Sequence, residues 1–172
     1  VSGFTFLTEE TQALQQDDFA NPGQLWADRG AALFNQGETP CSSCHEAQDF
    51  SQTAAQYPQW DADHGRLINL EGQINQCRTT QQDQPALAYE SDDLLALTTF
   101  VATQARGAAM NVSLTPEMEP AYQRGRDYFF TRRGQLNLAC SQCHDDQWGM
   151  QLRGDTISQG HGNGFPAYRL QW

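Results

Sequence analysis

The clearest hydrophobic pattern along the chain lies at residues 91–107. One apolar stripe recurs there every three or four residues, at Leu94, Leu97, Val101 and Ala105. Ser91 is a favourable N-cap, the two aspartates after it suit the positive end of a helix dipole, and Gly107 suits the helix end. The pattern predicts an amphipathic helix whose apolar face packs on another helix.

Helical spacing also appears in one stretch before residues 91–107 and in one stretch after them, at residues 25–36 and 115–134. These two stretches share an internal repeat. Each carries Arg-Gly followed by Phe four residues after the glycine: Arg29, Gly30 and Phe34, then Arg124, Gly125 and Phe129. A glycine inside a helix costs about 1 kcal/mol relative to alanine. Both glycines therefore predict the close approach of a second helix.

Each repeat leads into a C-x-x-C-H motif. The motif residues are Cys41, Cys44 and His45, then Cys140, Cys143 and His144. Thiols at i and i+3 lie on one side of a helical turn and can add to the two vinyl groups of a porphyrin, while the histidine binds the iron. The motifs predict two covalently bound haem c groups. A zinc site made by the four cysteines is the alternative, but it leaves the histidine after each pair unexplained.

The order of these elements predicts an all-α fold with two tandem cytochrome c-like domains. We expect an N-terminal extension at 1–24, a domain with haem one at 25–110, and the first part of a domain with haem two at 111–172. Residues 46–105 separate the first motif from the end of its closing helix, whereas only residues 145–172 follow the second. The second domain is therefore expected to be incomplete in this chain.

Composition and charge narrow the choice of partners. The net charge of −11 and the pI near 4.5 argue against nucleic acid and anionic membrane surfaces. No apolar run approaches the ~20 residues that span a bilayer. Only 38% of residues are hydrophobic, which favours a core completed by a large cofactor. Because haem is attached to cysteines on the outer face of the bacterial membrane, we expect a periplasmic protein whose signal peptide has been removed.

The distal ligand of haem one has two candidates, because no methionine lies between the first motif and the helix at 91–107. Cys77 comes just before that helix, where a distal ligand is expected, and Arg78 beside it would support a thiolate. A lone cysteine is otherwise an inert, buried small residue. His64 lies in a glycine- and aspartate-rich stretch that predicts a surface turn. We favour Cys77, whose thiolate would stabilise Fe(III) and lower the reduction potential.

The distal ligand of haem two is not evident in the sequence. Met150 follows His144 too closely to reach the opposite face of a haem easily. His161 is possible, but the glycines around it favour a loop whose backbone approaches another group closely.

Four strings resemble the SoxA family, whose members are the catalytic subunits of the SoxAX cytochromes of bacterial thiosulfate oxidation. They are NLEGQINQCR, LAYESDDLLALTTFVA, TRRGQLNLACSQCHDDQWG and GDTISQGHGNGFPAYRLQW. The resemblance runs from about residue 25 to the last residue. It implies haem attachment at both motifs and Cys77 as the thiolate ligand of haem one. It also implies a catalytic persulfide cysteine after YRLQW, beyond Trp172, so no catalytic residue is expected within this chain.

The resemblance implies a reaction and partners. Thiosulfate is joined to a cysteine of the carrier SoxYZ, and two electrons pass to the monohaem cytochrome SoxX. An acidic protein that handles a dianion needs local positive charge, for which Arg153 and Arg169 are candidates, although solvated surface arginines would look the same. Two other functions stay open: a dihaem electron carrier without catalysis, and a haem peroxidase with a displaceable ligand.

Overall fold

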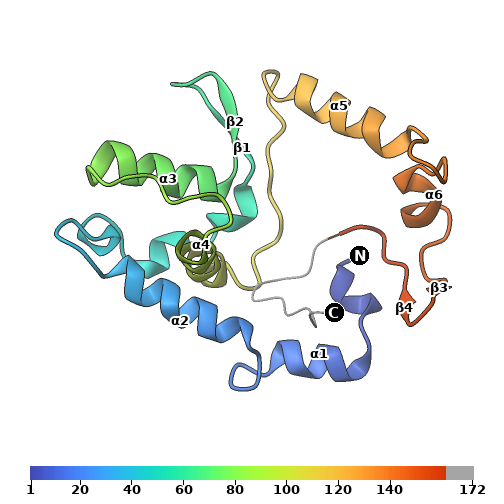
Figure 1. The fold of residues 1–172 in the computed structure, drawn as a ribbon, viewed down its shortest axis with the longest axis horizontal. Helices are drawn as coiled ribbons and strands as arrows, with labels where there is room; N and C mark the ends of the chain where they lie inside the picture. The colour runs from blue at the N-terminus through green and yellow to red at the C-terminus, as the bar shows by residue number, and fades with distance from the viewer. Residues whose placement is uncertain (162–172) are drawn as a thin grey trace. The chain divides into compact units, whose positions relative to one another are not determined.

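The computed structural model describes residues 1–161, which form a mostly helical protein (Figure 1). The described residues divide into two compact units. We call residues 17–113 the contiguous unit, and residues 1–16 together with 114–161 the split unit. None of the helices in this part of the chain is both long and apolar enough to cross a membrane.

The contiguous unit is built on two packed helices. Its elements, in order, are α2 (Gly23–Phe34), η2 (Cys41–Ser43), η3 (Ala47–Phe50), η4 (Ala54–Gln56), β1 (Gln59–Asp61), β2 (Arg66–Ile68), α3 (Leu70–Gln81) and α4 (Asp92–Gln104). Helices α2 and α4 lie side by side (Figure 1). A Cβ atom on Gly30 would lie 2.1 Å from the carbonyl oxygen of Ala96. The close helix approach predicted at Gly30 is therefore confirmed.

Helix α4 matches its sequence pattern closely. The Ser91 hydroxyl accepts a hydrogen bond from the Leu94 amide at 3.4 Å, which satisfies one of the free N–H groups at the helix start. All four residues of the predicted stripe are buried: Leu94, Leu97, Val101 and Ala105. At the N-terminus of α4, Arg29 of α2 donates to Asp93 at 2.7 Å and to Asp92 at 3.4 Å. Charge and packing thus fix α4 on α2.

The strictly all-α prediction was wrong in detail, because each unit carries a short antiparallel hairpin. In the contiguous unit β1 pairs with β2, with Gln59 opposite Ile68. In the split unit β3 (Gln151–Leu152) pairs with β4 (Asp155–Thr156). These pairings are set by tight turns between strands of two or three residues, which are too short to show a period of two in the sequence.

The split unit brings the start of the chain to the second haem motif. Its elements, in order, are η1 (Gly3–Phe6), α1 (Glu9–Gln16), α5 (Glu119–Phe130), α6 (Cys140–His144), β3 and β4. The ring of Phe6 packs edge-on against Trp148, with centroids 6.3 Å apart. Trp148 lies four residues after the motif histidine, so the N-terminal segment contacts the region that follows the motif.

Helix α5 differs from its repeat partner α2. A Cβ atom on Gly125 would meet no atom within 4 Å, and α5 has no buried residue among those described. The close approach predicted at Gly125 is not seen among residues 1–161 and stays a prediction. Aromatic side chains of α5, Tyr122, Tyr128 and Phe130, are each more than half exposed. The same Arg-Gly-x-x-x-Phe pattern thus packs on a helix in α2 and stays open in α5.

Candidate haem-binding sites

The first C-x-x-C-H motif forms a single helical turn. The amide of His45 donates to the carbonyl of Cys41 at 3.1 Å, so the chain closes one turn from the first cysteine to the histidine. Cys41 is half-buried, Cys44 is exposed, and neither is in a disulfide. Two free thiols on one turn followed by an exposed imidazole suit the attachment of a haem at its edge.

An aromatic wall lies behind this motif. The ring centroid of Phe50 is 5.3 Å from that of His45 and 5.9 Å from that of Phe34. Phe34 also packs against Phe100 at 5.2 Å and is only 4% exposed. These three phenylalanines come from η3, α2 and α4. They connect the motif histidine with the packed helix pair, and such an apolar surface fits one face of a porphyrin.

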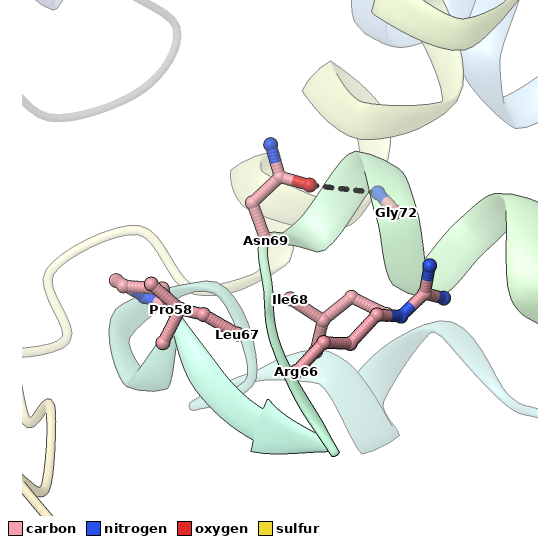
Figure 2. Close-up of a pocket in the computed structure, with 6 residues that line it drawn as sticks. All are labelled: Pro58, Arg66, Leu67, Ile68, Asn69 and Gly72. Carbon is pink, nitrogen blue, oxygen red and sulfur yellow. Dashed lines mark hydrogen bonds between the residues drawn. The ribbon is translucent and has the colours of Figure 1, made fainter. Parts of the chain in front are cut away.

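Helix α3, which carries Cys77, is fixed at its start by a side-chain cap. The Oδ1 atom of Asn69 accepts a hydrogen bond from the Gly72 amide at 2.9 Å (Figure 2). Figure 2 also shows the pocket at this junction, lined by Pro58, Arg66, Leu67, Ile68, Asn69 and Gly72. It includes no motif residue, and its one guanidinium already contacts Asp61 and Gln76. We therefore assign it a structural role.

Cys77 is half-buried among polar groups. The Nε2 atom of Gln73, one turn earlier on α3, donates to its sulfur at 3.5 Å. Burial raises the pKa of the Tyr57 hydroxyl, and the nearby Cys77 raises it further. Arg78 was expected to support the thiolate, but its Nε atom donates to the carbonyl of Pro85 at 3.3 Å. The observed partner of the sulfur is therefore the Gln73 amide, which no pattern in the sequence indicated.

The end of α3 reaches the first haem motif. Gln82, the C-cap residue, donates through Nε2 to the sulfur of Cys41 at 3.4 Å. Gln82 lies five positions after Cys77, which corresponds to a rise of about 7.5 Å along a helix. The helix that carries Cys77 thus meets the attachment cysteine directly, although the two lie far apart in the sequence.

His64, the rival ligand, lies in the turn between β1 and β2. Its Nδ1 atom is 2.9 Å from the carboxylate of Asp61, and its side chain is about half exposed. Burial would raise the pKa of the Asp61 carboxyl, but hydrogen bonds from His64 and Arg66 outweigh burial, and the pKa lies below its usual value. The surface turn predicted for His64 is confirmed.

The second motif forms α6 and holds its histidine by a hydrogen bond. The Nδ1 atom of His144 lies 2.9 Å from the carbonyl oxygen of Ser158. A Cβ atom on Gly160 would lie 3.6 Å from the same ring. Cys140 is exposed and Cys143 is half-buried, and both are free. The close backbone approach predicted for the glycine-rich loop is confirmed at Gly160, whereas the role of Ser158 had no signal in the sequence.

The candidate substrate arginines and the candidate distal ligands of haem two are exposed wherever the structure describes them. Arg153 is exposed in the turn between β3 and β4, with φ of 59°. Within the described residues it makes no hydrogen bond or ion pair. Arg169 lies outside the described residues. Met150 is 58% exposed and His161 is exposed. Among residues 1–161, no three His, Cys, Asp or Glu side chains converge as metal ligands.

Comparisons with known proteins agree with this arrangement. The SoxA/TsdA cytochrome c domain matches residues 29–110, and such a domain implies covalently bound haem c. The L-cysteine S-thiosulfotransferase subunit SoxA of Pseudaminobacter salicylatoxidans is 39% identical, over 99% of this chain and 62% of its own. The same subunit of Rhodovulum sulfidophilum is 35% identical, over 99% of this chain and 61% of its own.

A solved structure extends the similarity to the fold. A chain in the crystal structure of SoxXA from P. pantotrophus superimposes with a TM-score of 0.84 and 32% sequence identity, covering 92% of this chain and 62% of that one. The present chain therefore spans about three fifths of the length of the relatives that it matches. Within that span the helical fold agrees with the sequence comparison, and the first C-x-x-C-H motif lies inside the matched cytochrome c domain. Over nearly its whole length the chain is similar, in sequence and in fold, to the SoxA cytochromes c.

Proposed function

We propose that this chain is the dihaem part of an L-cysteine S-thiosulfotransferase. The observation that carries the proposal is the alignment with the SoxA subunit of P. salicylatoxidans, which covers 99% of the chain and so includes both C-x-x-C-H motifs. In each motif the structure leaves both thiols free, as covalent attachment requires. Two covalently bound haem c groups follow from two such motifs.

The finer architecture belongs to the same proposal. We assign residues 25–110 to a first cytochrome c-like domain and 111–172 to part of a second, with 1–24 as an extension. The repeat supports this division, because Gly30 of α2 packs on α4 whereas the matching glycine of α5 has an open face. An open face at that position is expected where a second closing helix would pack.

The ligands of haem one would be His45 and Cys77. The contact of Gln82 with Cys41 supports this pairing, because it brings the end of α3 to the motif, whereas His64 is held in its turn by Asp61. Gln73 would donate a hydrogen bond to a Cys77 thiolate and stabilise its charge. His144 would be the proximal ligand of haem two, and its distal ligand is not assigned.

In the proposed reaction thiosulfate and a carrier cysteine thiol form a cysteine S-thiosulfonate, with release of two electrons and one proton. Bound haem would supply one-electron acceptors for this oxidation. Arg153 and Arg169 would hold the dianion through charge-assisted hydrogen bonds. By resemblance the catalytic persulfide cysteine lies beyond Trp172, the partners are a SoxX-type monohaem cytochrome and a SoxYZ-type carrier, and the compartment is the periplasm. The similar P. pantotrophus chain comes from a crystal structure of SoxXA, which supports the first partner.

The test uses the full protein with its monohaem partner, the sulfur carrier and a soluble acceptor cytochrome. We expect thiosulfate-dependent reduction of the acceptor and a carrier whose mass increases by one thiosulfonate group. A carrier with its cysteine replaced by serine is the control and should give neither signal. Haems that cycle reversibly without any response to thiosulfate would instead establish the alternative, a dihaem electron carrier. The intact mass of the 172-residue chain counts its haems directly.

A further inference from the structure

The two motif histidines are held in different ways. The ring of His144 contacts the Ser158 carbonyl through Nδ1, at 2.9 Å. A carbonyl oxygen can only accept, so Nδ1 must carry the proton and Nε2 must carry the free lone pair. In the part of the chain that the structure describes, the ring of His45 makes no hydrogen bond and packs on Phe50 instead. Of these two described sites, only the second therefore fixes the tautomer of its histidine.

The segment that supplies this carbonyl is a tight turn, which is closed by a hydrogen bond between its own residues. The amide of Gly160 donates to the hydroxyl of Ser158 at 3.1 Å, which closes the turn beneath the imidazole. Gly160 has φ of 78°, which side-chain-bearing residues rarely adopt. A Cβ atom there would lie 3.6 Å from both Cγ and Nδ1 of His144, so the backbone of Gly160 lies directly against the ring.

We propose that the turn Ser158–Gly160 is a positioning element for the second haem site, which fixes the tautomer and the plane of His144 and makes the reduction potential of haem two depend on this turn. This inference rests on the proposed binding of a haem at the second motif. A donated Nδ1–H increases the electron density on Nε2, and a more basic ligand stabilises Fe(III). Loosening the turn should therefore raise the potential of haem two and leave haem one unchanged.

Matched glycine variants test the proposal in the haem-loaded chain. Gly160→Ala introduces a side chain at positive φ beside His144. Gly149→Ala introduces one at a similar φ of 83° in the same unit, where no atom of the described part of the chain lies within 4 Å of the new Cβ atom. Both variants place a side chain at a similar positive φ, and only the first places the strained residue in van der Waals contact with the ring of His144. Ser158→Ala is a milder variant, because it removes only the hydrogen bond to the Gly160 amide.

Redox titration followed by visible and EPR spectroscopy gives the readout. For Gly160→Ala and Ser158→Ala we expect the ratio of reduced to oxidised haem two, at a fixed potential, to rise by up to about tenfold. Tenfold is the lower end of the loss in metal affinity or activity that follows when such a hydrogen-bond partner is removed. Haem one, and both haems of Gly149→Ala, should titrate as in the parent. The proposal would be overturned by equal shifts in Gly149→Ala and Gly160→Ala. It would also be overturned if neither Gly160→Ala nor Ser158→Ala shifted the titration of haem two.

These outcomes are independent of the thiosulfate assay. If the shift is confined to haem two but the full protein ignores thiosulfate, the positioning role stands and the proposed enzyme activity fails. If thiosulfate is oxidised but neither turn variant moves the titration of haem two, the proposed activity stands and the positioning role fails.

Discussion

Replacing Cys77 with methionine is expected to raise the reduction potential of haem one and to abolish its low-spin thiolate EPR signature. A thiolate stabilises Fe(III), whereas a thioether favours Fe(II). The expected rise is on the order of 0.1 V or more, within the roughly 0.8 V range over which axial ligands set haem potentials. EPR and near-infrared spectra of the haem-loaded chain, together with redox titration, measure both effects.

His64→Ala is the control for this ligand, because His64 is the other candidate from the sequence. Its ring is held in the turn between β1 and β2 by Asp61, so its removal should leave the spectrum of haem one as it was. An unchanged thiolate signature in Cys77→Met, or its loss in His64→Ala, would show that the assignment of Cys77 is wrong. Gln73→Leu should instead lower the potential of haem one by a smaller amount, because the thiolate loses the amide that donates to the sulfur and gives more electron density to Fe(III).

Gly30→Ala is expected to destabilise the contiguous unit strongly, although it adds only one methyl group. The new Cβ atom would lie 2.1 Å from the Ala96 carbonyl oxygen and 2.6 Å from the Cβ atom of Phe100, so α2 and α4 must separate. Overpacking of this kind costs about 1–3 kcal/mol. In a chain of this size the thermal midpoint should fall by roughly 2–4 °C for each kcal/mol lost.

Gly125→Ala is the matched control, because it makes the same change at the same position of the repeat. Among residues 1–161 no atom lies within 4 Å of the new methyl group, and α5 should gain up to about 1 kcal/mol of helix propensity. Denaturant unfolding of both variants in the 172-residue chain separates the two effects. A loss of stability in Gly125→Ala as large as that in Gly30→Ala would contradict the open face of α5.

Features that depend on neighbouring residues were predictable from the sequence. The cap at Ser91, the buried stripe of α4 and both C-x-x-C-H turns are local patterns, and the structure reproduces them. The surface turn at His64 likewise follows from the glycine and aspartates around it. Each of these features is encoded within a few residues, where propensity and spacing act directly.

Features that depend on distant contacts were not predictable. The Arg-Gly-x-x-x-Phe pattern cannot tell a glycine that meets a helix within residues 1–161 from one that does not, because the partner lies elsewhere in the sequence, and so the difference between Gly30 and Gly125 was not predicted. The contacts of Gln82 with Cys41 and of Ser158 with His144 join segments with no shared period. Every residue has a backbone carbonyl, so the amino-acid type at position 158 does not indicate that its carbonyl binds His144. This partner could be found only in the structure.

The split unit has a consequence for the order in which the chain folds. The contact of Phe6 with Trp148 joins residues 142 positions apart, whereas the described part of the other unit, residues 17–113, is one continuous segment. Closing so long a loop costs more entropy and comes later than contacts within one segment. Pulsed hydrogen exchange during refolding should therefore protect the amides of α4 before those of α1. Residues 1–16 would then find their packing partners only once residues 114–161 are available, so the contacts around Trp148 should be among the latest to form.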